Sequence, residues 1–320
     1  MKTIIKLIPI VLLWAFVITG CNNKKETSAI KKLEQVFVGS NIQDAELRDK
    51  YCWNGERLNK IEAYENGNLA CWIEFDYLSG SNTKIAELRL LFPYNSKLHS
   101  SNFLIDGLKT IATFRKEKED DFVLSAKMVP VYVNDKVARL DIYSDFEFLY
   151  RELSLIGYII IEYDGDYPNK LSMRIKTSIF PPDYEIPEGV EEIEFFQKYF
   201  IWQNGNIITE YNKYIIVPDI PLDRNLSDLK TGDSTIYTYD DKLNAYSSIK
   251  NIIPVFGAEI SSTNNITFFE KHEFLGSAQM TTIREVTTNY QYDTDNYPTI
   301  ATTTDPLVNA KVVKYGYKSN

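Results

Sequence analysis

Hydrophobic and polar residues alternate along most of this chain. Runs such as Ile73–Tyr77 and Lys84–Leu90 carry an apolar side chain at nearly every second position. This is the period of a β-strand that buries one face. Dipeptides that favour tight turns separate successive runs, among them Asn54-Gly55 and Asn134-Asp135. Many short strands joined by hairpins predict an all-β fold: an antiparallel meander that forms a curved sheet or a partly closed barrel.

The same pattern predicts most of the remaining chain. Further strand runs are Val129–Val133, Val137–Tyr143, Tyr158–Tyr163, Leu171–Ile175, Ile207–Tyr211, Thr235–Tyr239, Ile266–Phe269, Thr287–Tyr292 and Lys311–Tyr317. A few minor helices are expected. Ser28–Phe37 places Ile30, Leu33 and Phe37 on one helical face, and Ser247–Ala258 is long enough for a short helix. For Ser144–Gly157 the pattern leaves strand and helix open.

One stretch interrupts the strands and suggests how the chain is divided. Phe180–Glu192 contains three prolines and an acidic run, a composition that ends regular structure. It predicts a seam between an N-terminal β part, residues 38–180, and a C-terminal β part, residues 193–320. The two parts are also compatible with one continuous sheet.

Residues 1–20 have the organisation of a secretory signal peptide. Lys2 and Lys6 precede the apolar run Leu7–Phe16, which is shorter than the roughly 20 residues that span a bilayer. The segment ends at Ile18-Thr19-Gly20-Cys21, which resembles the lipobox of bacterial lipoproteins. The resemblance implies cleavage before Cys21 and lipidation of that residue with palmitate-type acyl chains. Residues 21–37 then form a lipidated tether with the predicted short helix.

The residues after Cys21 bear on location. In lipoproteins of this kind an Asp after the cysteine often signals retention at the inner membrane, and this chain has Asn22 there. The resemblance therefore implies the outer membrane. Lipoproteins displayed on the cell surface often carry an acidic run nearby, whereas Asn23–Glu26 is Asn-Lys-Lys-Glu, which favours the periplasmic face. We expect the membrane to be a partner through Cys21, because several acyl chains together hold a protein stably.

The two other cysteines are expected to remain free thiols that are largely buried. Cys52 and Cys71 fall in a predicted meander whose turns are Asn54-Gly55 and Asn66-Gly67. They would lie two strands apart, roughly 9–10 Å. A disulfide tolerates Cα atoms only up to about 7 Å apart.

A short motif recurs in the second half of the chain. Tyr237–Asp240 and Tyr290–Asp293 both read Tyr-x-Tyr-Asp, and Tyr315–Tyr317 repeats the pattern without the acid. Aromatic residues two apart share one face of a strand, and the Asp starts the turn. The motif resembles the YD-repeat hairpins of Rhs and teneurin-type proteins. Together with Ser262–Ile266, it also resembles a family of uncharacterised bacterial envelope lipoproteins with a porin-like β fold. That family implies no catalytic residues.

Composition and motifs exclude several classes of function. The net charge of −9 argues against a nucleic-acid partner, because phosphate binding needs a basic face. The histidines, His99 and His272, lie in polar stretches and are expected to be exposed and inert. His272-Glu273 lacks the second histidine of a zinc protease, and the acids around Asp164 and Asp293 fit turns better than calcium loops. We therefore expect no catalytic residue, no metal site and no cofactor.

Two functional hypotheses follow. The first is a non-enzymatic lipoprotein, anchored in the outer membrane, that binds or scaffolds an envelope protein or another ligand. The alternative is a carbohydrate-active lipoprotein, which binds or hydrolyses glycans with Trp53, Trp72 and Trp202 as its aromatic surface. A transmembrane barrel is not favoured, because charged residues occupy both faces of predicted strands, for example Lys60 and Glu62 beside Arg57.

Overall fold

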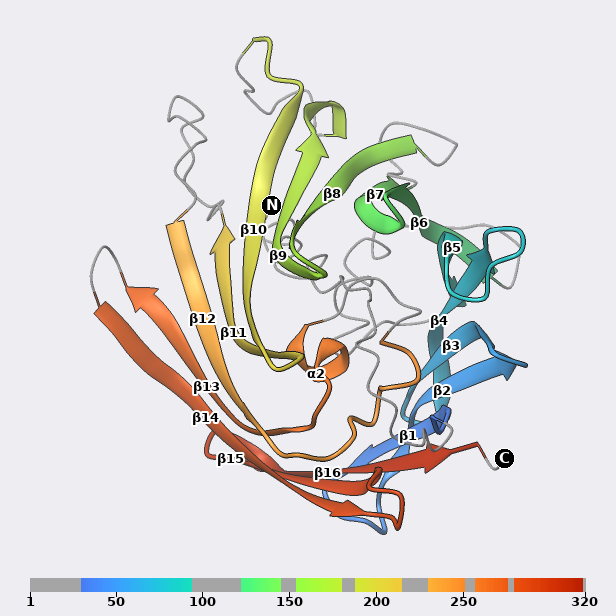
Figure 1. Cartoon of the computed structure of the whole chain (residues 1–320), viewed down its shortest axis with the longest axis vertical. Helices are drawn as coiled ribbons and strands as arrows, with labels where there is room; N and C mark the ends of the chain where they lie inside the picture. Colours follow the sequence, from blue (N-terminus) through green and yellow to red (C-terminus); the bar gives the residue numbers. More distant parts are fainter. Residues whose placement is uncertain are drawn as a thin grey trace.

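The computed structural model describes residues 30–93, 122–144, 154–179, 188–214, 230–250, 257–275 and 279–318. Within these ranges, sixteen antiparallel strands form one sheet that closes on itself. Each strand pairs with its neighbours in the sequence, and β1 pairs with β16 to complete the ring. Figure 1 shows the strands arranged around the short helix α2. The predicted all-β meander is confirmed, and the barrel is fully closed.

The bounds of the elements differ by only a few residues from most of the predicted runs. They are β1 Leu33–Gly39, β2 Glu46–Asn54, β3 Arg57–Glu65, β4 Asn68–Tyr77, β5 Ile85–Pro93, β6 Phe122–Val133, β7 Lys136–Ser144, β8 Ser154–Asp164, β9 Tyr167–Lys176, the 3₁₀ turn η2 Thr177–Ile179, β10 Glu192–Gln203, β11 Asn206–Tyr214, β12 Lys230–Tyr239, α2 Ala258–Ser261, β13 Ile266–Leu275, β14 Gln279–Tyr292, β15 Pro298–Asp305 and β16 Val308–Tyr317.

The predicted helix at Ser28–Phe37 is wrong over its described part. Leu33–Gly39 is β1, which pairs with β16 on one side and β2 on the other. Its backbone closes the barrel, and this tertiary pairing outweighs a local helical stripe. Residues 28 and 29 lie outside the described residues.

Other predicted features fall partly outside the description. Ser144–Gly157 becomes strand β8 from Ser154 onward, and residues 145–153 are not among the described residues. Ser247–Lys250 forms a hydrogen-bonded turn, and α2 begins only at Ala258. Residues 180–187, most of the predicted seam, also lie outside the described ranges. On either side of this stretch, β9 and β10 pair directly, Ile175 with Ile193.

The barrel has two different ends. At one end each even-numbered strand ends and the next odd-numbered strand begins, and Ile30 and Lys318 lie there as well. We call this end the turn rim. Its tight turns include Asn134-Asp135 and Asn204-Gly205, all with positive φ, as expected for hairpin turns of type I′. At the other end, the loop end, the ends of β5 to β12 flank most of the segments outside the description.

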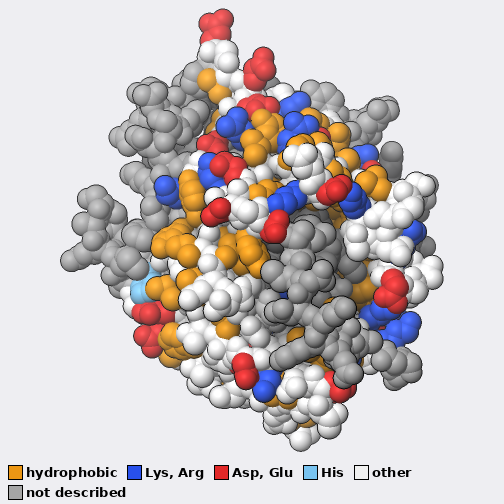
Figure 2. Space-filling model, viewed as in Figure 1, with side chains coloured by type: hydrophobic (Ala, Val, Ile, Leu, Met, Phe, Trp, Pro, Cys, Tyr) orange, Lys and Arg blue, Asp and Glu red, His pale blue; other side chains and the backbone are white. Residues whose placement is uncertain are grey.

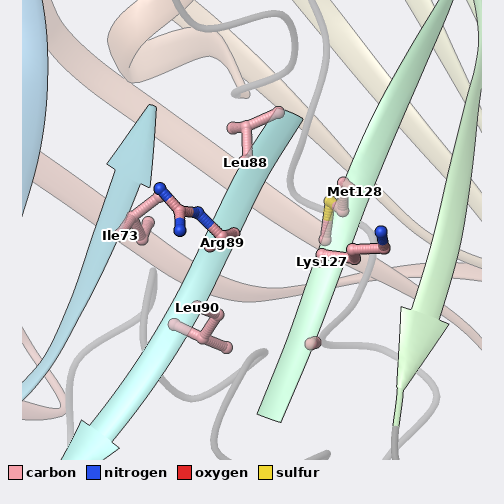
Figure 3. A pocket seen from close by; sticks show the side chains of 7 residues that line it. Ile73, Leu88, Arg89, Leu90, Lys127 and Met128 are labelled. Atoms are coloured by element: carbon pink, nitrogen blue, oxygen red, sulfur yellow. The ribbon is translucent and has the colours of Figure 1, made fainter. Parts of the chain in front are cut away.

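The hydrophobic core lies inside the barrel. Inward-facing residues of neighbouring strands, such as Ile61, Ile73 and Leu88, are buried. A small cavity remains between β4, β5 and β6, and Figure 3 shows Leu88, Leu90 and Met128 among the side chains around it. Its volume of about 10 Å³ is the space of a single water molecule. This part of the interior is therefore packed.

Candidate functional site: the turn rim and the outer face

A ring of aromatic side chains lines the turn rim. In each hairpin, a side chain near the end of the even-numbered strand donates a hydrogen bond to a backbone carbonyl at the start of the preceding strand. The bonds are Trp53 to Leu33 (2.7 Å), Tyr77 to Leu58 (2.8 Å), Tyr132 to Ile85 (3.0 Å), Tyr163 to Val137 (3.0 Å), Trp202 to Pro168 (2.7 Å), Tyr239 to Ile207 (2.5 Å), Tyr290 to Ile266 (3.0 Å) and Tyr317 to Pro298 (2.8 Å). We call these eight donors the aromatic girdle.

The girdle tyrosines stay protonated over a wide pH range. Burial raises the pKa of Tyr132 to about 12, and it raises the pKa of Tyr77, Tyr163 and Tyr317 further. The desolvated phenolate is disfavoured, so the neutral hydroxyl remains available as a donor. The girdle therefore fixes the strand ends at the rim at any physiological pH.

Basic side chains lie over several girdle rings. The residue just before the carbonyl acceptor supplies the cation: Lys32 over Trp53, Arg57 over Tyr77, Lys84 over Tyr132 and Lys136 over Tyr163, at 5.2–5.9 Å from the ring centroids. In two other hairpins that position is aromatic. Tyr167 stacks on Trp202 at 4.8 Å, and Tyr297 meets Tyr317 edge-on at 5.3 Å. Cation–π and ring contacts of this kind stabilise the rim.

The predicted aromatic residues lie in separate places. Trp53 and Trp202 belong to the girdle, on β2 and β10. Trp72 lies on the outer face of β4 and is 7% exposed; its Nε1 donates to Glu74 and Lys60 covers its ring. Sequence reasoning found the Tyr-x-Tyr hairpins but missed that Trp53, Tyr132 and Trp202 occupy the same position. The common signal is an aromatic residue shortly before a hairpin turn.

The outer face of the barrel wall is charged. Outward-facing side chains form ion pairs within a strand and between neighbouring strands. Within β3 and β7 these are Lys60–Glu62 (2.7 Å) and Arg139–Asp141 (2.7 Å). Between strands they include Arg89–Glu74 (3.3 Å), Lys127–Glu87 (3.2 Å) and Lys170–Glu162 (2.8 Å). Figure 2, in the view of Figure 1, shows acidic, basic and hydrophobic side chains interspersed over the face seen there. Burial alone would raise the pKa of Glu62, but hydrogen bonds from Lys60 and Tyr64 outweigh it and lower that pKa.

A segment between β12 and β13 lies inside the barrel. Its described residues, 240–250 and 257–265, we call the inner segment. The backbone N–H of Ala258 donates to Glu210 (2.8 Å), which also pairs with Lys198 (2.6 Å). On the opposite side, the N–H of Leu33 donates to Ser248 (3.1 Å), and Tyr246 meets Tyr315 edge-on. The inner segment thus connects β10 and β11 with the closure between β1 and β16.

The candidate catalytic and metal-binding side chains of the described ranges do not lie together in one site. His272 is buried rather than exposed as predicted, 3.4 Å from Glu270 and 3.3 Å from Thr282. The Asp293 carboxylate accepts the N–H groups of Asp295 and Tyr297, in the predicted role of a turn residue. Among the described residues, no group of three or more His, Cys, Asp and Glu is placed to hold a metal ion. His99 and Cys21 lie outside these residues.

The remaining cysteines are free thiols, as predicted. Cys71 is buried, while Cys52 on β2 is partly exposed. Burial raises the pKa of the Cys52 thiol, and the nearby Glu62 carboxylate raises it further. The thiolate is therefore disfavoured, and Cys52 has the environment of an unreactive thiol.

None of the helices in the described part of the chain has the length and apolar character needed to cross a membrane. No protein-family model matches the chain, and a comparison with curated proteins gave no match. Solved structures match this chain, among them two that cover most of its length. A porin-like protein from Bacteroides vulgatus is 11% identical, with a TM-score of 0.37, covering 91% of this chain and 100% of that one. A porin-like protein from Bacteroides uniformis is 10% identical, with a TM-score of 0.43 and coverages of 89% and 98%.

Proposed function

We propose that this chain is an outer-membrane-anchored lipoprotein with a non-enzymatic binding or scaffolding role in the cell envelope. The lipobox at Ile18–Cys21 supplies the attachment. The observation that carries the proposal is the chemistry of the two faces of the barrel wall. Ion pairs such as Lys60–Glu62 and Arg139–Asp141 lie on the outer face, and most of the buried apolar side chains point inward, where the Lys198–Glu210 pair is buried as well.

A barrel that spans a membrane has the reverse arrangement. Its outer face is an apolar band, and its interior is polar. A lysine or arginine at the middle of the lipid face costs about 2–4 kcal/mol, and Lys60, Arg89 and Arg139 all lie on the outer face here. The wall is therefore suited to water, and the acyl chains on Cys21 would make the membrane contact.

The loop end is the best placed surface for a ligand. Loops carried by a rigid scaffold are where binding residues usually lie, and the described part of the connection between β9 and β10 lies at this end. A groove of about 380 Å³ also opens there, lined by Lys176–Ser178 and Gly189–Glu192. An envelope protein or a glycan is the class of ligand that fits this proposal.

Fractionation of cells tests the anchor. We expect Cys21→Ala to move the protein from the membrane to the soluble fraction, because no acyl chain is then attached. Cys52→Ala is the matched control and should remain with the membrane. A Cys21→Ala protein that stays in the membrane fraction would contradict the proposal.

A screen of the soluble 22–320 fragment against a glycan array tests the class of ligand. A scaffold for envelope proteins predicts no glycan hit. A specific hit would favour the carbohydrate-binding alternative.

A further inference from the structure

Both described chain ends lie at the turn rim. The backbone N–H of Lys31 donates to the hydroxyl of Tyr297, and the N–H of Lys318 donates to the carbonyl of Lys32. Eight residues lie between Cys21 and Ile30, so the nine steps between them span at most about 32 Å when fully extended and about 17 Å as a flexible chain. A lipid on Cys21 would therefore hold this end of the barrel near the membrane.

The rim has the composition of a membrane interface. Apolar side chains project from its turns and its chain end: Ile30 is 57% exposed, Val133 55%, Tyr167 43% and Leu78 40%. Tyrosine and tryptophan rings of the girdle lie just behind them, with lysine and arginine stems across the rings. Aromatic belts flanked by basic residues are typical of the headgroup level of a bilayer.

Charge is distributed unevenly between the two ends. At the rim the basic residues Lys31, Lys32, Arg57, Lys84, Lys136, Lys242 and Lys318 nearly balance the acids Glu56, Asp135, Asp164, Asp166, Asp240, Asp241, Asp293 and Asp295. At the loop end the described turns and strand ends carry the acids Asp44, Glu46, Glu65, Glu188, Glu191, Glu192 and Asp305 and the bases Lys176 and Lys230. Near an anionic lipid surface the acidic end is repelled and the balanced end is not.

We propose that the turn rim rests on the phospholipid headgroup layer, so that the barrel stands on the membrane with its loop end outward. This orientation rests on the proposed lipid anchor at Cys21. The exposed turns of the rim make the contact, and the barrel wall remains in water.

Fluorescence quenching on vesicles tests the orientation. The full-length, lipidated protein is reconstituted into phosphatidylethanolamine vesicles with a minority of phosphatidylglycerol. An environment-sensitive fluorophore is attached to Val133→Cys at the rim or to Leu307→Cys, in a turn at the loop end and also exposed. Both variants carry Cys52→Ser, and native Cys71, 1% exposed, does not react. The vesicles contain lipids with a nitroxide in the headgroup.

We expect the nitroxide lipids to quench the Val133 label at least about twofold more than the Leu307 label. Leu78→Cys provides a second rim position if Val133→Cys folds poorly. Equal quenching at both ends, or stronger quenching at Leu307, in protein that floats with the vesicles would overturn the orientation and leave the anchor standing. Protein that does not float with the vesicles would overturn the anchor, and the orientation with it.

Discussion

The residues that organise the barrel are the donors of the aromatic girdle. Strand ends leave backbone carbonyls with no partner in the ladder, and such groups are costly when buried. A tyrosine or tryptophan suits such a position, because its ring packs on the core and its O–H or N–H donates a hydrogen bond to the carbonyl. Tyr77 and Trp53 show the two chemical versions of this contact, a phenol and an indole.

Removing one girdle hydroxyl should have a measurable cost. We expect Tyr77→Phe to lower the free energy of unfolding by about 0.5–1.5 kcal/mol, because the carbonyl of Leu58 loses its donor while the ring remains. Tyr167→Phe is the control, since its half-exposed ring stacks on Trp202 from outside the girdle. Equal effects of the two variants in chemical denaturation would contradict the role of the girdle.

The girdle also predicts how stability depends on pH. Tyrosine in the unfolded chain has a pKa near 10, whereas Tyr132 in the folded protein has a pKa of about 12. The raised pKa means that its contribution is complete below about pH 10 and is lost as the pH rises toward 12. We expect the free energy of unfolding to fall over this range, and to fall less steeply for Tyr132→Phe. The same slope in both proteins would contradict the assignment.

Some residues of the aromatic girdle could be predicted from the sequence, and others could not. The repeat was visible at Tyr237–Asp240 and Tyr290–Asp293 because both residues of each pair are tyrosine. The repeat could not be recognised at Trp53 and Trp202, because tryptophan replaces tyrosine there and no Asp follows. The hydrogen bonds from the girdle residues to carbonyls of the preceding strand could not be predicted, because a local sequence pattern does not specify contacts between strands.

At the scale of elements, the inner segment fastens one side of the barrel to the other. Its anchor is the Lys198–Glu210 pair, whose side chains are 6% and 7% exposed, and Glu210 also holds the N–H of Ala258 and the hydroxyl of Tyr237. A buried charge is tolerated only with its partner. The position of α2 therefore depends on an intact pair.

Removing one partner of the Lys198–Glu210 pair should strongly destabilise the protein. We expect Glu210→Leu to lower the free energy of unfolding by about 3–5 kcal/mol, because Lys198 is left buried and uncompensated. The double variant Lys198→Met with Glu210→Leu should recover a large part of this loss, and denaturation curves of the three proteins measure it. A double variant no more stable than Glu210→Leu alone would contradict this account of the pair.

Strand prediction succeeded where one face of a strand is buried and turn residues mark its ends. It failed at β1, because Ile30, Leu33 and Phe37 also fit a helical stripe. Pairing with β16, at the other end of the chain, makes this segment a strand rather than a helix. Closure of the barrel likewise depends on pairing between distant segments, which a local period of two does not encode.

At the scale of the whole molecule, the two faces of the wall define what the barrel is suited to do. Aliphatic side chains make up most of the packed interior, where the Lys198–Glu210 pair is also buried, and ion pairs lie over the outside. The charged outer face is suited to contact with water. Sequence reasoning reached the same expectation from Lys60 and Glu62, which the structure places together on the outer face. The lipid proposed on Cys21 would make membrane attachment independent of the wall.

We propose that the barrel wall stands in water beside the membrane. A nitroxide at Glu285→Cys, an exposed position at the middle of β14, reports on it in the full-length, membrane-bound protein with Cys52→Ser. Spin-label accessibility should show frequent collisions with a water-soluble nickel chelate and few with oxygen dissolved in the bilayer. Dominant collisions with oxygen, as for a label facing lipid, would contradict the account.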